Sequence, residues 1–429
     1  MTCAQRAYCS PQPRRSPMRT LKVVLILFLL TCSQVHAATV WYQPTPYPLK
    51  KMDGSSLPQD LDKVHVWDGW LNNSFNTTLV RDDKLQAGGW GDVYRSYLNW
   101  DLVGLPQNPT TVNLWFQFYT AGGTPTPFQF CIPNSSWNTT VAWGSQPSVL
   151  GCTGMFNPPT SGGWAGWNIT SWYQNWQSGA WGKYGILINP QSNNNNFVAI
   201  RSSRYTSDGL RPILQFDFTP TLELKMPLPG AASWLLTNEA GGYECKGESP
   251  WPDVAHQGNS YFSLDFSPSN QKDTGGSYSG DIPIIAAANG IVAYAETSPY
   301  VPNGYHIVLN HSGSSSTTSG YTTKYLHLKD RPRRSNGTLL SVGDTVAQGD
   351  QIGIMGTTGQ LANGTPTSTA THLHFGVYQN GSASSSLSAL TQVVMDGWLL
   401  KSFQTECAVN SSGVPTSRVR YYHSSNRAY

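Results

Sequence analysis

Histidines in the second half of the chain form the pattern best suited to chemistry. Seven of the nine histidines follow residue 220, and His372 and His374 lie in Thr371–Val377, which has the composition of a strand. Side chains two apart on a strand share a face, so both imidazoles should point the same way while Leu373 and Phe375 enter the core. The pair could therefore present two nitrogen ligands, or two proton acceptors, to one point.

Three more residues complete an inventory that fits zinc. His327 lies between two leucines in Tyr325–Leu328, and His256 and Asp265 add an earlier imidazole and a carboxylate. A catalytic zinc takes three protein ligands of this kind and keeps one position for water. The ion lowers the pKa of that water from near 16 to about 7, and two further histidines could handle its protons.

Each of these residues has a plainer explanation when it is taken alone. A His-x-His pair on a strand is more often a surface or core-edge pair than a metal site, and the other residues indicate nothing singly. The loop Gly356–Gly359 is interpreted as a turn, because it lacks the lysine and helix start of a phosphate-binding loop. We expect structural or ordinary strand roles for His306 and His311, and we identify no partners for His65 and His423.

The order of the motifs carries a family resemblance. From about residue 222 to 400 the chain resembles the lysostaphin-like zinc endopeptidases. Ile282–Val292 matches a hairpin of that family, in which Asn289-Gly290 would form the tight turn. The other matching stretches are Asp265-Phe266, Ile307–His311, Tyr325–Leu328, Gly343–Val346, Gly349, Ile352-Gly353, Gly356–Gly359 and His372–Phe375.

The resemblance implies a role for each candidate residue. It makes His256, Asp265 and His374 the ligands of one Zn2+ per chain, with His327 and His372 as the catalytic pair, and it leaves open which of the two is the general base. Eight residues separate His256 from Asp265, whereas three are common in the family, so His256 departs most from the pattern.

The resemblance also implies a reaction and a substrate. The expected reaction is hydrolysis of a peptide bond in bacterial peptidoglycan, often at glycine-rich links, by zinc-bound water with the two histidines assisting. One alternative is a protease of other extracellular polypeptides. Another is a non-catalytic wall-binding or polysaccharide-binding protein whose peptidase domain is degenerate.

The first half of the chain has a different composition. Thirteen of the 16 tryptophans lie between Trp41 and Trp181, and short aromatic-rich runs such as Asn113–Tyr119 and Pro212–Phe218 predict strands. A helix is expected at Asn168–Gln177, where Trp172 and Trp176 would share a face. Residues 60–218 resemble the DNRLRE-type β-sandwich domains in the stretches Arg95–Leu102, Val141–Pro147, Trp167–Thr170 and Trp176–Gly179.

These observations predict an all-β protein. We expect an N-terminal jelly-roll-like β-sandwich followed by an antiparallel β-sheet metallopeptidase domain with a zinc groove. The resemblance allows the sandwich to bind polysaccharide, although most tryptophans should fill its core. The expected divisions are a signal peptide at 1–37, the sandwich at 38–220, the peptidase domain at 221–407 and a flexible tail at 408–429.

The N-terminus and the charge balance favour export. Basic residues precede the apolar run Val23–Leu30, and Val35-His36-Ala37 resembles a signal cleavage site; the run is too short to span a bilayer. Removing residues 1–37 leaves 22 Lys and Arg against 24 Asp and Glu, so no basic excess suggests nucleic acid. We therefore expect a secreted or cell-envelope protein without a permanent membrane span.

Four cysteines remain after that removal. An even number in an exported chain suggests disulfides, and four cysteines allow three pairings. We favour Cys131–Cys152 and Cys245–Cys407, because each pair then lies inside one expected domain.

Overall fold

The computed structural model describes residues 37–43, 66–238 and 263–423 with gaps. The gaps inside these ranges are residues 76, 101, 103–104, 122, 139, 193–195, 231–232, 269–279, 382–391, 401–402, 404–405, 410–414 and 419. The expected signal peptide, apart from Ala37, and the candidate ligand His256 lie outside the described residues. The chain is all-β with one α-helix among the described residues, as the sequence predicts.

The first half builds two sheets whose apolar faces meet. One contains β1, β3, β5, β8, β10 and β11, and the other has the order β2-β4-β9-β6-β7. Phe116 and Phe130, one from each sheet, have ring centroids 5.9 Å apart. The bounds are β1 (Ala38–Tyr42), β2 (Val66–Asn72), β3 (Lys84–Ala87), β4 (Tyr94–Trp100), β5 (Thr111–Phe118), β6 (Phe128–Pro133), β7 (Val149–Cys152), β8 (Gly163–Asn168), β9 (Ile186–Pro190), β10 (Val198–Arg201) and β11 (Ile213–Phe218).

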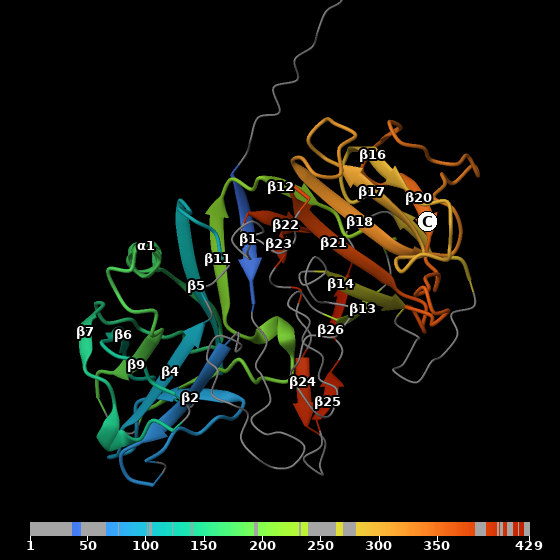
Figure 1. Cartoon of the computed structure of the whole chain (residues 1–429). Helices are drawn as coiled ribbons and strands as arrows, with labels where there is room; N and C mark the ends of the chain where they lie inside the picture. The colour runs from blue at the N-terminus through green and yellow to red at the C-terminus, as the bar shows by residue number, and fades with distance from the viewer. Residues whose placement is uncertain are drawn as a thin grey trace, which may run out of the picture. The chain divides into compact units, whose positions relative to one another are not determined.

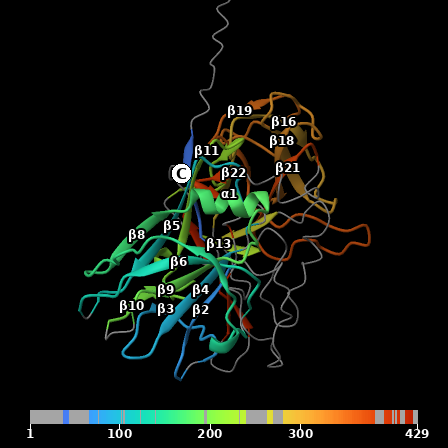
Figure 2. The same ribbon diagram turned by 90° about the vertical axis from the view of Figure 1, so that its left-hand side faces the viewer.

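Alternation along the strands explains this packing. Buried and half-buried residues alternate through all of β5 and β11, as a strand with one face on the core requires. The helix α1 (Thr170–Ser178), seen in Figure 2, confirms the predicted helix. It buries Tyr173 and Trp176. The jelly-roll topology and the DNRLRE resemblance stay predictions.

The first expected disulfide is confirmed. Cys131 and Cys152 are bonded, and they lie directly opposite each other on β6 and β7. Cys245 lies outside the described residues, so the Cys245–Cys407 pairing stays a prediction.

The second half is organised by one mainly antiparallel sheet. Its order is β19-β16-β17-β18-β21-β14-β13-β26 (Figure 1), and it covers a core that includes Phe266, Ile307, Tyr325 and Phe375. The bounds are β13 (Ser233–Asn238), β14 (Leu264–Pro268), β16 (Gly290–Ala295), β17 (Tyr305–Asn310), β18 (Tyr321–Leu328), β19 (Thr345–Val346), β21 (Leu373–Gln379) and β26 (Arg420–His423).

Smaller pairings surround this sheet. β15 (Pro283–Ile285) pairs with β20 (Gln351–Ile354), and β24 (Glu406–Val409) pairs with β25 (Pro415–Arg418). β12 (Leu222–Leu224), β22 (Val393–Met395) and β23 (Trp398–Leu399) extend the sheet that contains β1. The expected boundary near residue 220 is not tested by these contacts and stays a prediction.

One expectation about the second half is wrong. Ile282–Val292 is not a hairpin, because β15 pairs with β20 while β16 pairs with β17 and β19. Arg420–His423 forms β26 and pairs antiparallel with β13, and the expected division at residue 408 stays a prediction. In the part of the chain that the structure describes, no helix has the length and apolar character needed to cross a membrane.

Candidate active site

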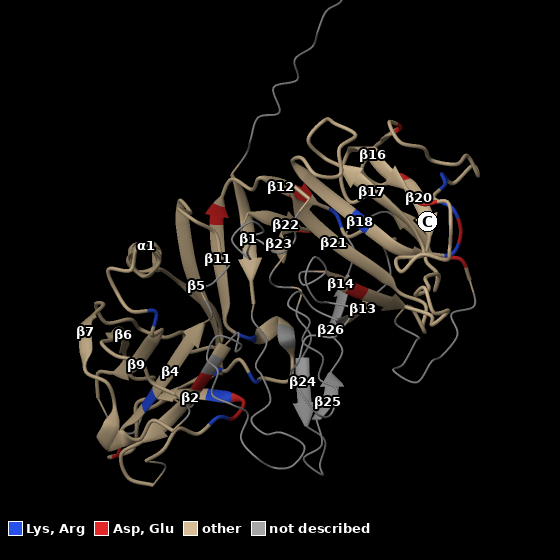
Figure 3. Ribbon diagram, in the orientation of Figure 1, with Lys and Arg blue, Asp and Glu red and all other residues tan. Residues whose placement is uncertain are grey.

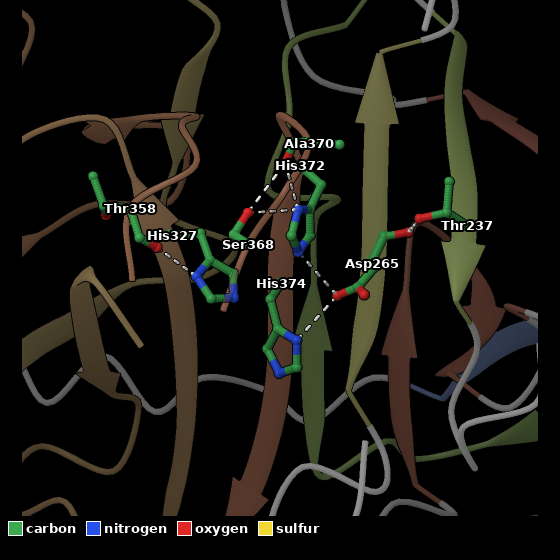
Figure 4. A network of polar contacts seen from close by, with 8 residues as sticks. All are labelled: Thr237, Asp265, His327, Thr358, Ser368, Ala370, His372 and His374. Carbon is green, nitrogen blue, oxygen red and sulfur yellow. Dashed lines mark hydrogen bonds and ion pairs between the residues drawn. The ribbon is translucent and has the colours of Figure 1, made fainter. Parts of the chain in front are cut away.

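Two neighbouring strands bring a carboxylate and an imidazole together. Asp265 of β14 lies directly opposite His374 of β21, and Leu326 of β18 lies opposite His374 on the other side. Leu373 and Phe375 belong to the hydrophobic core, whereas His374, also buried at 4% exposed, has its ring beside Asp265 on the opposite face, as the predicted alternation requires. Figure 4 shows the resulting cluster.

Four of the five predicted residues converge at this point. Asp265 Oδ1 lies 3.0 Å from His374 Nδ1 and 3.9 Å from His372 Nε2. The ring centroid of His327 lies 4.9 Å from that of His372 and 5.9 Å from that of His374 (Figure 4). The fifth residue, His256, lies outside the described residues.

His327 reaches the cluster through an irregularity in its strand. Tyr325 and Leu326 keep a regular register with Phe375 and His374, so strict alternation would turn His327 to the core side with Tyr325. The pairing of β18 with β17 shifts at this point, and His327 has a φ of 62°. Bulges of this kind re-aim side chains beside functional sites.

A backbone carbonyl fixes the orientation of the His327 ring. His327 Nδ1 lies 2.7 Å from the carbonyl oxygen of Thr358 (Figure 4). A carbonyl only accepts, so Nδ1 carries the proton and Nε2 of the neutral ring is left as an acceptor. Burial, followed by the charges of His372 and His374, lowers the pKa of His327 to about 3, so the ring is neutral near pH 7.

Thr358 is itself held at three points. Its hydroxyl donates to the carbonyl of Leu328 at 2.6 Å and accepts from the amide of Tyr305 at 2.9 Å, while its own carbonyl holds His327. This loop therefore ties the ends of β17 and β18 to the imidazole. Sequence reasoning interpreted it only as a turn, although its glycines were a usable signal.

Two glycines allow the loop to come this close. A Cβ on Gly359, which has a φ of 134°, would lie 2.2 Å from Thr367 Oγ1 and 3.2 Å from His327 Nδ1. A Cβ on Gly304 would lie 2.3 Å from the carbonyl of Thr358. Any larger residue at either position would displace the contact that orients His327.

His372 is oriented in the same way. Its Nδ1 lies 2.9 Å from the carbonyl oxygen of Ala370 and 3.3 Å from Ser368 Oγ, so Nε2 faces Asp265. The side chain of His372 is 16% exposed against 5% for His374, which makes it the more accessible of the two.

Two histidines outside the cluster, His306 and His311, make structural contacts. His311 Nδ1 lies 2.8 Å from the carbonyl of Asn289 and its Nε2 lies 2.8 Å from Thr323 Oγ1, which ties β18 to the residue before β16. His306 stacks on Tyr294, with ring centroids 5.1 Å apart. Both agree with the structural roles expected from the sequence.

The described donors fit part of a zinc site. No three metal-ligating side chains among the described residues form a complete metal-binding group. Two ligands about 2.1 Å from one tetrahedral zinc lie roughly 3.4 Å apart, and Asp265 Oδ1 and His374 Nδ1 are 3.0 Å apart. These two donors therefore suit the ion, and a third ligand would have to come from elsewhere in the chain.

Comparison with known proteins agrees with this chemistry. Residues 274–386 match the sequence model of peptidase family M23. The chain is 34% identical over 99 residues to peptidoglycan DD-endopeptidase ShyC of Vibrio cholerae, a match that covers 23% of this chain and 18% of ShyC.

Solved structures of low similarity also align. A Pseudomonas aeruginosa crystal structure described as a candidate peptidase M23 is 24% identical, with a TM-score of 0.22, and covers 38% of this chain and 48% of that one. Helicobacter pylori Csd3 is 14% identical, with a TM-score of 0.24, over 73% of each chain. The chain thus spans under a fifth of the curated relative and about half of the first structure. Together with the site geometry, the sequence match assigns residues 274–386 to a domain of peptidase family M23.

Proposed function

We propose that this protein is a secreted zinc-dependent endopeptidase that hydrolyses peptide bonds in bacterial peptidoglycan. The observation that carries the proposal is the convergence of Asp265 and His374 with two histidines whose Nδ1 atoms are held by backbone carbonyls. The M23 domain supports the reaction class, and the similarity to a peptidoglycan endopeptidase supports the substrate.

The residues divide into metal-holding and proton-handling groups. Asp265 and His374 would hold one Zn2+ together with His256, which the sequence pattern supplies. Bound there, zinc would polarise the scissile carbonyl and make a water molecule more acidic.

His327 and His372 would handle the protons. Each has its Nδ1–H bonded to a carbonyl, which leaves Nε2 to take a proton from the attacking water. The resulting imidazolium donates from Nε2, so it would stabilise negative charge on the carbonyl oxygen and then protonate the leaving nitrogen. The C–N bond breaks, and the products are a carboxylate and an amine.

Export and wall attachment belong to the proposal as well. The N-terminal signal pattern and the peptidoglycan substrate support action in the cell envelope or outside the cell. The N-terminal sandwich, through its resemblance to DNRLRE-type domains, would contact polysaccharide near the substrate.

Digestion of purified peptidoglycan tests the reaction. Hydrolysis of a peptide bond should release free amino groups without reducing sugar ends, and chelation should stop the release until zinc is restored. Reducing ends without new amines would refute the endopeptidase. New amines from casein but none from peptidoglycan would instead favour a protease of extracellular proteins.

Variants separate the two groups of residues. His374→Ala should lose most of its zinc, whereas His327→Ala and His372→Ala should keep zinc and lose about 10²–10⁴-fold in turnover. His306→Gln lies outside the cluster and serves as the control. Full zinc occupancy in His374→Ala would remove His374 from the ligand set, and near-normal activity of either other variant would end its catalytic role.

A further inference from the structure

A lysine lies on the same sheet face as the candidate site. Lys324 of β18 lies opposite Gly376 of β21, just as Leu326 lies opposite His374 two residues further along. Residues two apart on a strand share a face, so Lys324 and His374 are on the same side of the sheet. Along the strand direction, the position of Lys324 is displaced from that of His374 by two residues, or about 7 Å.

Lys324 is a half-buried cation without an acidic partner in the described part of the chain. Lys225 and Lys329 pair with Asp396 and Asp281, but no ion pair joins Lys324 to any described carboxylate. Burial lowers the pKa of the Lys324 ammonium. Figure 3 shows the basic position on β18 in blue.

An aromatic ring supports the ammonium group. Lys324 Nζ lies 4.0 Å from the ring centroid of Tyr378, which is 2% exposed. A Cβ on Gly376 would lie 2.6 Å from the Tyr378 ring and 2.8 Å from Ser263 Oγ. Because Gly376 has no side chain, the Tyr378 ring can pack against β21 at this position, directly under Lys324. A cation–π contact holds the charge in place without neutralising it.

We propose that Lys324 binds a carboxylate of the peptide substrate, one or two residues from the scissile bond. This inference rests on the proposed function, because it places the ligand on the peptide that the candidate site would cut. An extended peptide advances about 3.3 Å per residue, so a carboxylate two residues from the reacting carbonyl would span the distance to Lys324.

The chemistry favours a carboxylate over a neutral group. Partly buried charges are stabilised by a partner of opposite sign, and a charge-assisted hydrogen bond is stronger than a neutral one. The peptides of bacterial cell walls carry free carboxylates on side chains and at their C-termini, and both present the same oxygen ligands. The charge on Lys324 would therefore select acidic peptides over their amidated forms.

The test compares three substrates and three variants of the full-length zinc-loaded protein. The substrates are a cross-linked muropeptide, the same muropeptide amidated at its C-terminal carboxyl, and the same muropeptide amidated at its side-chain carboxyl. The variants are Lys324→Met, Lys324→Arg and, as a matched control, Lys329→Met. Thermal unfolding of each variant checks that it is folded.

For wild-type protein, kcat/KM should be about ten- to a hundredfold lower for one amidated form than for the free acid, mainly because KM is higher. The affected form identifies the carboxylate source. Lys324→Met should lose this preference, Lys324→Arg should keep part of it, and Lys329→Met should keep it all. The substrate comparison on wild-type protein decides the question even if Lys324→Met does not fold.

Two outcomes would overturn this inference alone, and a third would also overturn the proposed function. Equal cleavage of all three substrates by wild-type protein, or an equal loss on all three in folded Lys324→Met, would make Lys324 structural while leaving the endopeptidase proposal intact. No new amines from any muropeptide or from whole peptidoglycan would instead overturn the proposed function, and this inference with it.

Discussion

Replacement of Thr358 by Val should disable the site without touching a candidate ligand. Val has nearly the same shape but lacks the hydroxyl that donates to the Leu328 carbonyl and accepts from the Tyr305 amide. The loop would lose both ties to the ends of β17 and β18. Its carbonyl, which orients His327, would then be free to shift.

The expected loss follows from these two hydrogen bonds. Each contributes about 1 kcal/mol net, and a backbone group left unsatisfied costs roughly 1–3 kcal/mol. For the two backbone groups this is roughly 2–6 kcal/mol, and if about half of it appears as misorientation of His327, the barrier rises by about 1–3 kcal/mol. This corresponds to a roughly 5–150-fold lower kcat. KM should change little, because the hydroxyl bonds backbone groups of its own chain.

The assay is steady-state hydrolysis of a muropeptide, with zinc content measured in parallel. Thr358→Ser keeps the hydroxyl and should restore most of the activity. Thr357→Val changes the exposed neighbouring residue in the same way and should behave as wild type. Normal kcat in folded Thr358→Val, or an equal loss in Thr357→Val, would refute the argument that Thr358 positions His327.

Three further predictions concern the fold around the site. Gly359→Ala should lower activity more than tenfold, because its Cβ would lie 2.2 Å from Thr367 Oγ1. Gly337→Ala, at a φ of 84° with no atom within 4 Å, should lower the free energy of unfolding by only about 1 kcal/mol, and equal activities of the two variants would contradict this. Burial lowers the pKa of His306, so the unfolded chain binds more protons than the folded chain below pH ~6.5. The free energy of unfolding should therefore fall as pH falls, by up to about 1.4 kcal/mol per pH unit from this residue. Urea titrations of His306→Gln should show a shallower dependence on pH, and an unchanged dependence would reject the assignment. Replacing Cys131 and Cys152 by Ser should lower the free energy of unfolding of the sandwich by about 3 kcal/mol, because the bond closes a loop of 21 residues, and an unchanged denaturation midpoint would count against it.

Local patterning predicted much of the site from the sequence. Alternation along Leu373–Phe375 separated the core residues Leu373 and Phe375 from His374, which lies beside Asp265. The spacing of His372 and His374 likewise predicted that both imidazoles would point the same way, and both lie near Asp265 Oδ1. These features depend on the two-residue period of a strand, which any window of the sequence contains.

Features that depend on distant partners were not predictable in this way. Asn289-Gly290 has the composition of a hairpin turn, but β15 finds its partner at β20, more than 60 residues later. The direction of His327 depends on a shift in register between β17 and β18, and on a carbonyl 31 residues away. The alternation of residues along a single strand does not predict either contact, because each depends on a residue far away in the sequence.

The support of the cluster has a consequence for how the protein would fail under stress. Asp265 and His374 are fixed by the ladder of the central sheet, whereas His327 and His372 are oriented by carbonyls of connecting segments. Connecting segments open at a smaller free-energy cost than a paired sheet. Mild denaturant or heat should therefore displace His327 and His372 while Asp265 and His374 stay paired, and cooling should restore the cluster.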